Sequence, residues 1–256
     1  MENIKILYGG SMNEVIKAGN TVHRRAQGHP MLHRYLLFLE ESGMLGVPRF
    51  LGFDEQGREI LSFIPGKTMG VDYPPDHPCL HSDETLQGMA KILRQLHDIS
   101  VEFVPIALEN GWINPYFPDE IPETICHNDT NIWNFAFVDE RPVGLFDFDQ
   151  AYPGARVWDL ASTVFSAVGL VPYDYIPAEH AVERKRLISL LFEAYGMDCP
   201  INFLDILIRR HQIVCDETVA ELEAGFESAV KAVESGALAH YQRVVKHMKE
   251  HGSEWF

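Results

Sequence analysis

Residues 125–161 constrain this chain more than any other stretch of its sequence. The segment reads ICHNDTNIWNFAFVDERPVGLFDFDQAYPGARVWDLA and is dense in polar side chains. Those of interest are His127, Asp129, Asn134, Asp147, Asp149 and Asp159. Such oxygen ligands suit magnesium, which usually takes one or two protein carboxylates together with the phosphates of a substrate. The stretch therefore predicts a site that combines a bound hard cation with a carboxylate base.

The order of these residues matches the layout of phosphoryl-transfer sites. In that layout one Asp orients the attacking hydroxyl, and an Asn and a second Asp hold the metal ions. The spacing H-x-D-x-x-x-x-N runs from residue 127 to 134, and a strand then ends in D-F-D. Strands at 135–138 and 143–146, joined by a turn at 139–142, would bring Asn134 and Asp147 together. A single acid of this kind is more often a turn or cap residue, so the prediction depends on the whole series.

With these motifs the sequence resembles the aminoglycoside phosphotransferase and choline kinase group, which are small-molecule kinases with a protein-kinase-like fold. The segments H-N-D-T-N-I-W-N, L-F-D-F-D and W-D-L-A occur in order, and the resemblance spans most of residues 5–165. It implies an α+β, bilobal fold with a small antiparallel-sheet N-terminal lobe and a larger, mainly helical C-terminal lobe. It also implies that ATP, with magnesium, phosphorylates a hydroxyl of a small molecule.

The resemblance assigns a role to each of these residues. Asp129 orients or deprotonates the acceptor hydroxyl, and His127 beside it shapes the catalytic loop by hydrogen bonding. Asn134 and Asp147 would hold magnesium. Asp159, at the start of a helix, resembles the buried acid that braces the loop in that family.

Several departures from protein kinases favour a small-molecule acceptor over a protein. Asn131 stands two residues after Asp129, where protein kinases have lysine, and the A-P-E segment is absent. D-F-D also lacks the glycine of D-F-G. Its second acid, Asp149, either assists the metal or meets the substrate, and the sequence leaves both roles open. Ala155-Arg156 replaces the acid-Pro pair that many relatives have before the final Asp.

Residues 1–66 are expected to form the nucleotide-binding lobe, and residues 67–256 the catalytic and acceptor-binding lobe. Alternating apolar residues in 3–25 predict strands with tight turns. The first turn, where the family has its phosphate-covering loop, consists of Gly9, Gly10 and Ser11. Arg24 takes the place of the strand lysine that holds phosphates in kinases, with Arg25 as a second candidate. Arginine grips phosphate bidentately, so the charge role survives the substitution.

The helix predicted at residues 31–42 lacks the mid-helix Glu that orients the strand cation in kinases. His33 is the best-placed polar residue for that task, and Glu40 is the alternative. Strands around residues 47–53 and 58–64 follow, and Pro65-Gly66 ends the sheet. In the resembling fold adenine bonds main-chain groups at this hinge, which corresponds here to the Ser62 carbonyl and the Ile64 amide.

The net charge of −16 is unevenly distributed. Residues 1–66 hold seven acids and seven bases, which leaves 30 of the 37 acids and 14 of the 21 bases in residues 67–256. A negative field disfavours nucleic-acid partners and attracts cations, so a cationic aminoglycoside or amino alcohol is a candidate acceptor. The simpler alternative is that this charge keeps the protein soluble.

Helices are predicted at residues 177–195, 200–226 and 228–249. Acids along the second helix would face a cationic acceptor or lie on a solvated helix face; they are Asp205, Asp216, Glu217, Glu221 and Glu223. No run approaches the roughly 18 apolar residues of a membrane span. The N-terminus lacks the apolar core of a signal peptide, and the four cysteines form no C-x-x-C pair. A cytoplasmic protein without membrane partners is expected, and its oligomeric state stays open.

Two other functions compete with the kinase prediction. Asp147-Phe148-Asp149 resembles the D-x-D nucleophile of a phosphatase, although Ala151 stands where that motif expects Thr or Val. A catalytically silent nucleotide-binding module would account for the missing strand lysine and helix Glu. The sequence does not distinguish ATP from GTP, nor does it name the acceptor.

Overall fold

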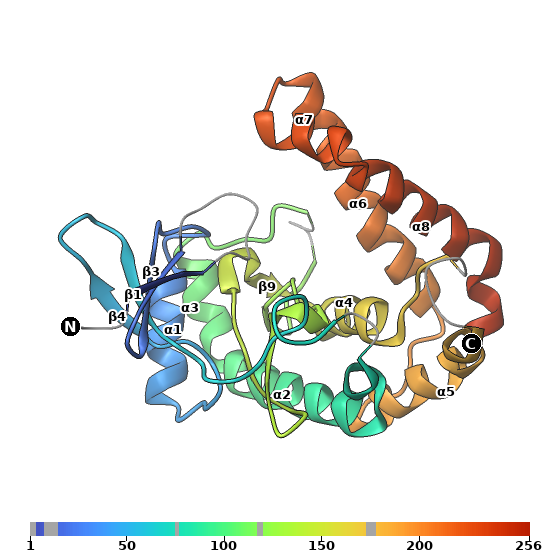
Figure 1. Ribbon diagram of the computed structural model, residues 1–256, viewed down its shortest axis with the longest axis horizontal. Helices are drawn as coiled ribbons and strands as arrows, with labels where there is room; N and C mark the ends of the chain where they lie inside the picture. The colour runs from blue at the N-terminus through green and yellow to red at the C-terminus, as the bar shows by residue number, and fades with distance from the viewer. Residues whose placement is uncertain (1–3, 8–14, 75–76, 117–119, 173–177) are drawn as a thin grey trace.

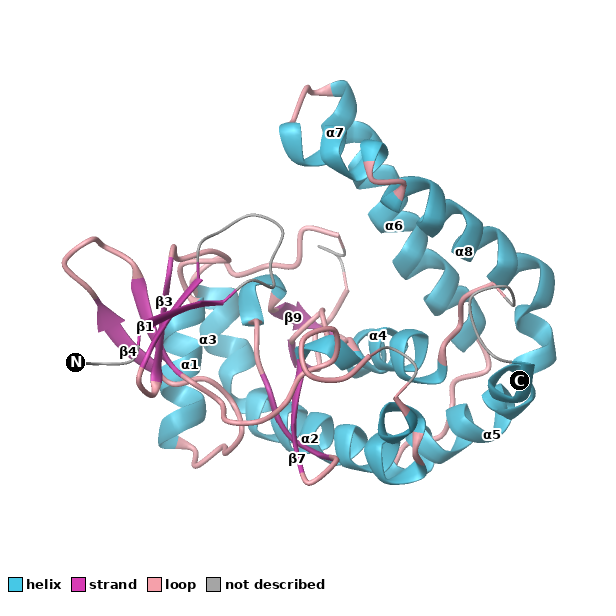
Figure 2. Cartoon of the chain, viewed as in Figure 1, coloured by secondary structure: helices cyan, strands magenta, loops and turns pink. Residues whose placement is uncertain are grey.

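The computed structural model describes residues 4–7, 15–74, 77–116, 120–172 and 178–256. Near the N-terminus five short strands form one antiparallel sheet in the order β1-β2-β3-β5-β4. Their bounds are Ile4–Leu7 for β1, Val15–Ala18 for β2, Thr21–Arg24 for β3, Phe50–Phe53 for β4 and Glu59–Ser62 for β5. The remainder of the chain is mainly helical and extends away from the sheet (Figures 1 and 2).

Glycine and asparagine or aspartate residues close the turns of this sheet. β2 and β3 are joined by Gly19-Asn20, and Gly19 has a φ of +59°, which glycine adopts without steric cost. Between β4 and β5 the Asp54 carboxylate accepts hydrogen bonds from the amides of Gln56 and Arg58. Such local side-chain bonds favour a turn over a continued strand.

The helix predicted at residues 31–42 is confirmed as α1 (Leu32–Glu41). Leu32, Tyr35, Leu36 and Leu39 recur at helical spacing and are buried. Figure 1 places α1 beside the N-terminal sheet. The apolar face of this helix therefore belongs to the hydrophobic core and holds the sheet against the rest of the chain.

A long helix, α2 (Asp83–Ser100), supports the segment that follows it in sequence. Ser82 caps the helix, since its Oγ accepts a hydrogen bond from the Thr85 amide at 3.1 Å. The apolar side of α2 contacts β6 (Thr124–Cys126), β8 (Arg141–Leu145), α4 (Arg156–Val168) and α5 (Ala178–Tyr195). Between α2 and β6 lies the short helix α3 (Val104–Glu109).

The central segment contains two small two-stranded sheets. β6 pairs with β9 (Tyr152–Gly154), and β7 (Phe135–Val138) pairs with β8. The predicted four-residue turn of the second hairpin is wrong: the turn is Asp139-Glu140, and β8 begins at residue 141. Both turn residues have positive φ, as two-residue hairpin loops often require, so the strands continue closer to the turn.

Three helices form the C-terminal region: α6 (Phe203–Glu223), α7 (Glu227–Glu234) and α8 (Ala237–His251). The single helix predicted at 228–249 is wrong, because Gly236, with a φ of +80°, separates α7 from α8. α6 and α8 pack against each other, and Figure 1 shows both at the end of the molecule away from the N-terminal sheet. Within the described residues no helix is long and apolar enough to cross a bilayer.

Candidate active site

The carboxylate of Asp129 is held in the loop between β6 and the 3-10 turn Ile132–Asn134 by two carboxamides. Asn134 Nδ2 donates to Asp129 Oδ2 at 2.8 Å and to its backbone carbonyl at 2.9 Å. Asn131 Nδ2 donates to Asp129 Oδ1. These contacts fix the orientation of a half-buried carboxylate whose other lone pairs face the neighbouring pocket.

Asp159 organises the backbone of this loop from the first turn of α4. Its buried carboxylate accepts hydrogen bonds from the amides of His127 and Asn128, each at 2.7 Å. Asn128 has a φ of +61°, a conformation that a non-glycine residue keeps only when its surroundings impose it. Burial raises the pKa of Asp159, but its hydrogen bonds and the charge of His97 outweigh burial and lower that pKa below its usual value. Asp159 is therefore ionised, and its carboxylate accepts a hydrogen bond from each of the two loop amides.

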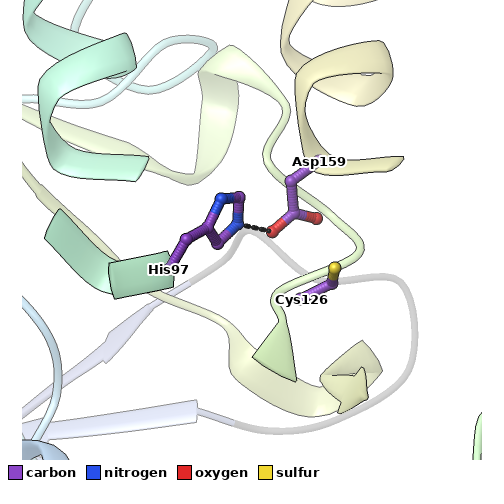
Figure 3. A group of neighbouring side chains, drawn as sticks. All are labelled: His97, Cys126 and Asp159. Carbon is purple, nitrogen blue, oxygen red and sulfur yellow. Dashed lines mark hydrogen bonds and ion pairs between the residues drawn. The ribbon is translucent and has the colours of Figure 1, made fainter. Parts of the chain in front are cut away.

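The group formed by His97, Cys126 and Asp159 has the composition of a metal site (Figure 3). However, both nitrogens of His97 are engaged, Nε2 with Asp159 at 2.9 Å and Nδ1 with the Tyr195 hydroxyl at 2.7 Å. The Cys126 thiol donates to the Ala155 carbonyl, and burial raises its pKa well above the usual value, so it stays protonated. The contacts of this group are those of a structural brace under the catalytic loop.

His127 links the catalytic loop to the D-F-D segment. Its Nε2 donates to the Phe146 carbonyl at 3.0 Å, and its Nδ1 accepts from the Asp129 amide at 3.2 Å. Burial lowers the pKa of His127, which favours the neutral ring that this donor and acceptor pattern requires. The ring also packs edge-on against Phe148 at 4.4 Å. Both ring nitrogens therefore serve loop geometry.

The β7–β8 hairpin places Asn134 and Asp147 at the same end. Asn134 immediately precedes β7, and Phe146 at the other strand end donates its amide to the Asn134 carbonyl at 3.0 Å. Asp147 follows with φ +69° and ψ +63°, a left-handed conformation uncommon for a non-glycine residue. Since strained backbone is concentrated at functional sites, this outlier supports a role for Asp147 beyond that of a turn residue.

Arg24 joins the N-terminal sheet to the D-F-D segment. Its Nη1 donates to Asp147 Oδ1 at 2.9 Å and to Asp149 Oδ2 at 3.1 Å, and its Nη2 donates to Asp149 Oδ1. Its Nε donates to Glu59 Oε1 at 2.8 Å. The neighbouring candidate, Arg25, is exposed. Three carboxylates therefore surround the guanidinium of Arg24.

The acid beside Arg24 differs from both residues expected from the sequence. His33 is not a direct partner: its Nε2 lies 2.7 Å from Glu59 Oε2, so it reaches Arg24 only through Glu59. Glu40 instead contacts Arg49 on the outside. Glu59 is buried and stands directly opposite Arg24 in the β3–β5 register, a cross-strand position. Sequence reasoning missed this residue, although pairing the two predicted strands would have suggested it.

The excess of carboxylates affects the protonation of Asp149. Burial raises its pKa, the charge of Asp147 raises it further, and Arg24 opposes both, with a net pKa of about 6. Asp149 therefore takes up a proton as the pH falls below about 6.

The remaining predicted nucleotide contacts lie at the sheet edge or outside the described residues. Gly9, Gly10 and Ser11 lie outside them. The Ser62 amide donates to the Arg49 carbonyl at 2.9 Å, and the next amide, of Phe63, donates to the Asn20 carbonyl. Among the described residues the Ile64 amide has no hydrogen-bond partner.

A pocket of about 360 Å³ opens beside Asp129, between the catalytic loop, α4 and α6. Of the five acids predicted along α6, Glu217 and Glu221 line this pocket. Asp216 instead accepts a hydrogen bond from Gln212 on its own helix. The periodicity of the sequence did not distinguish the acids of α6 that line the pocket from Asp216.

Comparison with known proteins identifies relatives of this chain among phosphotransferases and immunity proteins. The family model described as the phosphotransferase enzyme family matches residues 106–181. The trifolitoxin immunity protein of Rhizobium leguminosarum bv. trifolii is 33% identical over 204 residues, which cover 75% of this chain and 73% of that protein.

Solved structures resemble the whole chain. A spectinomycin phosphotransferase in complex with ADP and spectinomycin superposes with a TM-score of 0.63 at 14% identity, covering 96% of this chain and 92% of that one. A choline/ethanolamine kinase family protein from Mesorhizobium loti gives a TM-score of 0.57 at 15% identity, with the same coverages.

The fold is therefore the bilobal, protein-kinase-like fold of small-molecule kinases, as the sequence predicted. The chain belongs to the phosphotransferase enzyme family, the group that includes aminoglycoside phosphotransferases and choline kinases, and it is related there to the trifolitoxin immunity protein.

Proposed function

We propose that this protein transfers the γ-phosphate of ATP to a hydroxyl of a small molecule in a magnesium-dependent reaction. The observation that carries the proposal is Asp129, fixed by Asn134 at the edge of a pocket and close in the fold to Asp147. Residues 1–66 would form the nucleotide-binding lobe, and residues 67–256 the catalytic and acceptor-binding lobe.

Asp129 would accept a hydrogen bond from the acceptor hydroxyl and orient its oxygen toward the γ-phosphate. Phosphoryl transfer needs mainly positioning and charge neutralisation, so a fixed carboxylate is more useful than a strong base. His127 and Asp159 would contribute by holding the loop, since both side chains are buried and hydrogen-bonded to the backbone of the site.

Asn134 and Asp147 have the chemistry of magnesium ligands. The Nδ2 of Asn134 is used on Asp129, which leaves its Oδ1 for a cation, and the side chain of Asp147 is 43% exposed. Magnesium bound there would neutralise charge on the transferred phosphate. Asp149 would join this ligand set or keep its contact with Arg24.

Arg24 would bind the α- and β-phosphates. Its guanidinium now contacts Asp147 and Asp149, so phosphate binding requires it to exchange at least one carboxylate for phosphate oxygens. Glu59 would hold Arg24 through Nε during the exchange, and His33 would steady Glu59 from the other side. The Ser62 carbonyl and the Ile64 amide would contact adenine, with residues 9–11 covering the phosphates.

The acceptor is proposed to be a hydroxyl compound of antibiotic or amino-alcohol type. The solved spectinomycin phosphotransferase carries ADP and an antibiotic, and the curated relative is an immunity protein. Phosphorylation of an antibiotic hydroxyl would connect these two descriptions.

A second candidate is a nucleotide-binding immunity protein without turnover. It is favoured by the contacts of Arg24, which occupy both acids of D-F-D, and by an arginine in the place of the strand lysine. It would bind nucleotide but transfer no phosphate.

Magnesium-dependent ATP consumption over a panel of hydroxyl compounds distinguishes the two. The panel contains aminoglycosides, choline, ethanolamine, homoserine and simple sugars, and the test variant is Asp129→Asn. Asp139→Asn, in the exposed turn of the β7–β8 hairpin, is the matched control. Turnover that Asp129→Asn loses and Asp139→Asn keeps supports the kinase. ATP binding with no turnover supports the second candidate, and the absence of ATP binding refutes both.

A further inference from the structure

The pocket beside Asp129 has one wall made by a single face of α6. Arg210, Val214, Glu217 and Glu221 occupy positions i, i+4, i+7 and i+11, which lie on one side of an α-helix. The charge along this face changes sign, from a cation beside the catalytic loop to two acids farther along. This wall of the pocket is therefore positively charged near Asp129 and negatively charged away from it.

Arg210 lies at the inner end, next to the catalytic base. Its Nη2 donates to the carbonyl of Asn128, the residue before Asp129. Among the described residues this is its only hydrogen bond, and the carboxylates of Asp159 and Asp129 act on it through their charge without a direct ion pair. The half-buried guanidinium lines the pocket with donors that are still available, and a guanidinium fork suits a carboxylate or a phosphate.

Two buried polar atoms at the same end also lack partners. The Ser162 side chain is 2% exposed, and its Oγ has no hydrogen bond among the described residues. The Oδ1 of Asn131 is likewise buried without a partner there. Both residues line the pocket. Buried polar atoms are nearly always hydrogen-bonded in native proteins, so this end is built to receive polar atoms of a ligand.

The outer end carries the acids. Glu217 lines the pocket together with Glu221 and Tyr116. Seven residues separate Glu217 from Arg210, which at 1.5 Å per residue places their backbones roughly 10 Å apart along α6. A compact zwitterion, whose two charges are adjacent, is too short to contact Arg210 and Glu217 at once. The occupant must extend along the helix.

We infer that the acceptor carries an anionic group beside its reacting hydroxyl, bound by Arg210 and Ser162, and a cationic group about 10 Å away, bound by Glu217. This assignment rests on the proposed function, in which Asp129 receives the hydroxyl. It selects a hydroxyl compound of mixed charge over a polycation, because an ammonium at the inner end would face Arg210. The C-terminal serine of a short peptide has this arrangement.

Arg210 has a second source of anionic oxygen, the phosphoryl group of ATP. The two sources differ in what they predict. If Arg210 binds the anionic group of the acceptor, its substitution weakens acceptor binding in the absence of nucleotide and leaves ADP binding unchanged. If Arg210 binds only the phosphoryl group, its substitution leaves acceptor binding without nucleotide unaffected.

The test is calorimetric titration of the full chain, without nucleotide, with the tripeptide Gly-Gly-Ser. Its carboxylate adjoins the serine hydroxyl, and its ammonium lies roughly 10 Å away when the chain is extended. The matched probes are the C-terminal amide, which lacks the carboxylate, and the N-acetyl peptide, which lacks the cation. The variants are Arg210→Gln, Arg210→Lys and Glu217→Gln. Arg186→Gln, which removes an exposed arginine on α5, is the control.

The amide is expected to bind about tenfold more weakly than the peptide acid, the strength of one charge-assisted hydrogen bond. This difference should vanish in Arg210→Gln, persist in part in Arg210→Lys and remain whole in Arg186→Gln. The N-acetyl peptide should likewise bind more weakly than the free peptide, and this difference should vanish in Glu217→Gln. Equal binding of acid and amide, no saturable binding at millimolar peptide, or tighter binding of kanamycin each overturns the inference. ADP titration of the same samples tests the proposed function separately and also reports folding of each variant.

Discussion

Glu59 offers a sharp test of how the candidate site is held together, through the substitution Glu59→Gln. The carboxylate is fully buried and accepts from Arg24 Nε at 2.8 Å, with His33 Nε2 at 2.7 Å on its other oxygen. Glutamine keeps the shape but turns an amide donor toward one of these donors. Losing one partner of a buried ion pair costs about 3–5 kcal/mol. Arg24 retains Asp147 and Asp149, so we expect the low end, about 3 kcal/mol of unfolding free energy.

The assay is urea unfolding at pH 7, followed by circular dichroism, for the wild type, Glu59→Gln and Glu55→Gln. Glu55 is an exposed acid in the turn between β4 and β5, so its variant controls for the loss of one negative charge. Glu55→Gln should stay within about 0.5 kcal/mol of the wild type.

Function should respond as well, because Arg24 loses its fixed orientation. With an acceptor in hand, Glu59→Gln should raise KM for ATP roughly tenfold and change kcat much less, a division expected when ground-state binding is lost. An unfolding free energy of Glu59→Gln equal to that of Glu55→Gln would refute the reasoning. So would an unchanged KM for ATP.

The remaining predictions concern the base, the acid pair and a helix cap. Asp129→Asn should lower kcat by roughly 10²–10⁴, since the hydroxyl is no longer oriented by a charge, while ADP affinity in calorimetry stays unchanged. Because the folded-state pKa of Asp149 is raised to about 6, the folded protein binds more protons than the unfolded one between about pH 4 and pH 6. Stability measured by urea unfolding should therefore fall as pH rises through that window, and Asp149→Asn should remove this contribution. Ser82→Ala should cost about 1 kcal/mol by removing the α2 cap, measured as a lower thermal midpoint.

Each of these has an outcome that would contradict it. Unchanged kcat in Asp129→Asn would remove this residue from the reaction. A pH profile of stability that is identical in the wild type and Asp149→Asn would show that Asp149 titrates normally. Ser189→Ala, at an exposed position on α5, is the control for the cap variant, and equal effects of the two would exclude a capping role.

The arrangement of residues 129–147 could be predicted from sequence because its geometry is local. Asp129 and Asn134 are five residues apart, and a hairpin of adjacent strands returns the chain to Asp147. Short loops and hydrogen-bonded turns leave such a segment few arrangements. For the same reason the helix at α1 and the Ser82 cap followed from apolar spacing and side-chain type.

The partners of Arg24 could not be predicted in this way. Glu59 is 35 residues away, and Asp147 and Asp149 are more than 120 residues away, so the contacts depend on strand register and on how the sheet meets the helical part. The kinase comparison directed attention to α1, whereas the acid stands on β5. His33 does belong to the cluster, but one contact removed from the arginine.

The C-terminal helices show the same division. Apolar periodicity predicted helical structure but missed the break at Gly236 and did not tell which acids of α6 face the pocket. The direction of each side chain depends on the rotation of α6 against α4 and α8, which packing determines.

By itself, then, the amino-acid order determined the motif series of residues 127–159, because its geometry follows from local spacing and turn chemistry, and the resemblance of these motifs to small-molecule kinases gave the family and the fold class. Only the tertiary structure decided which acid holds Arg24, which groups bond to His97 and Asp159, and which charges line the pocket beside Asp129. Those contacts join residues distant in sequence, and their geometry is set by packing of the whole core.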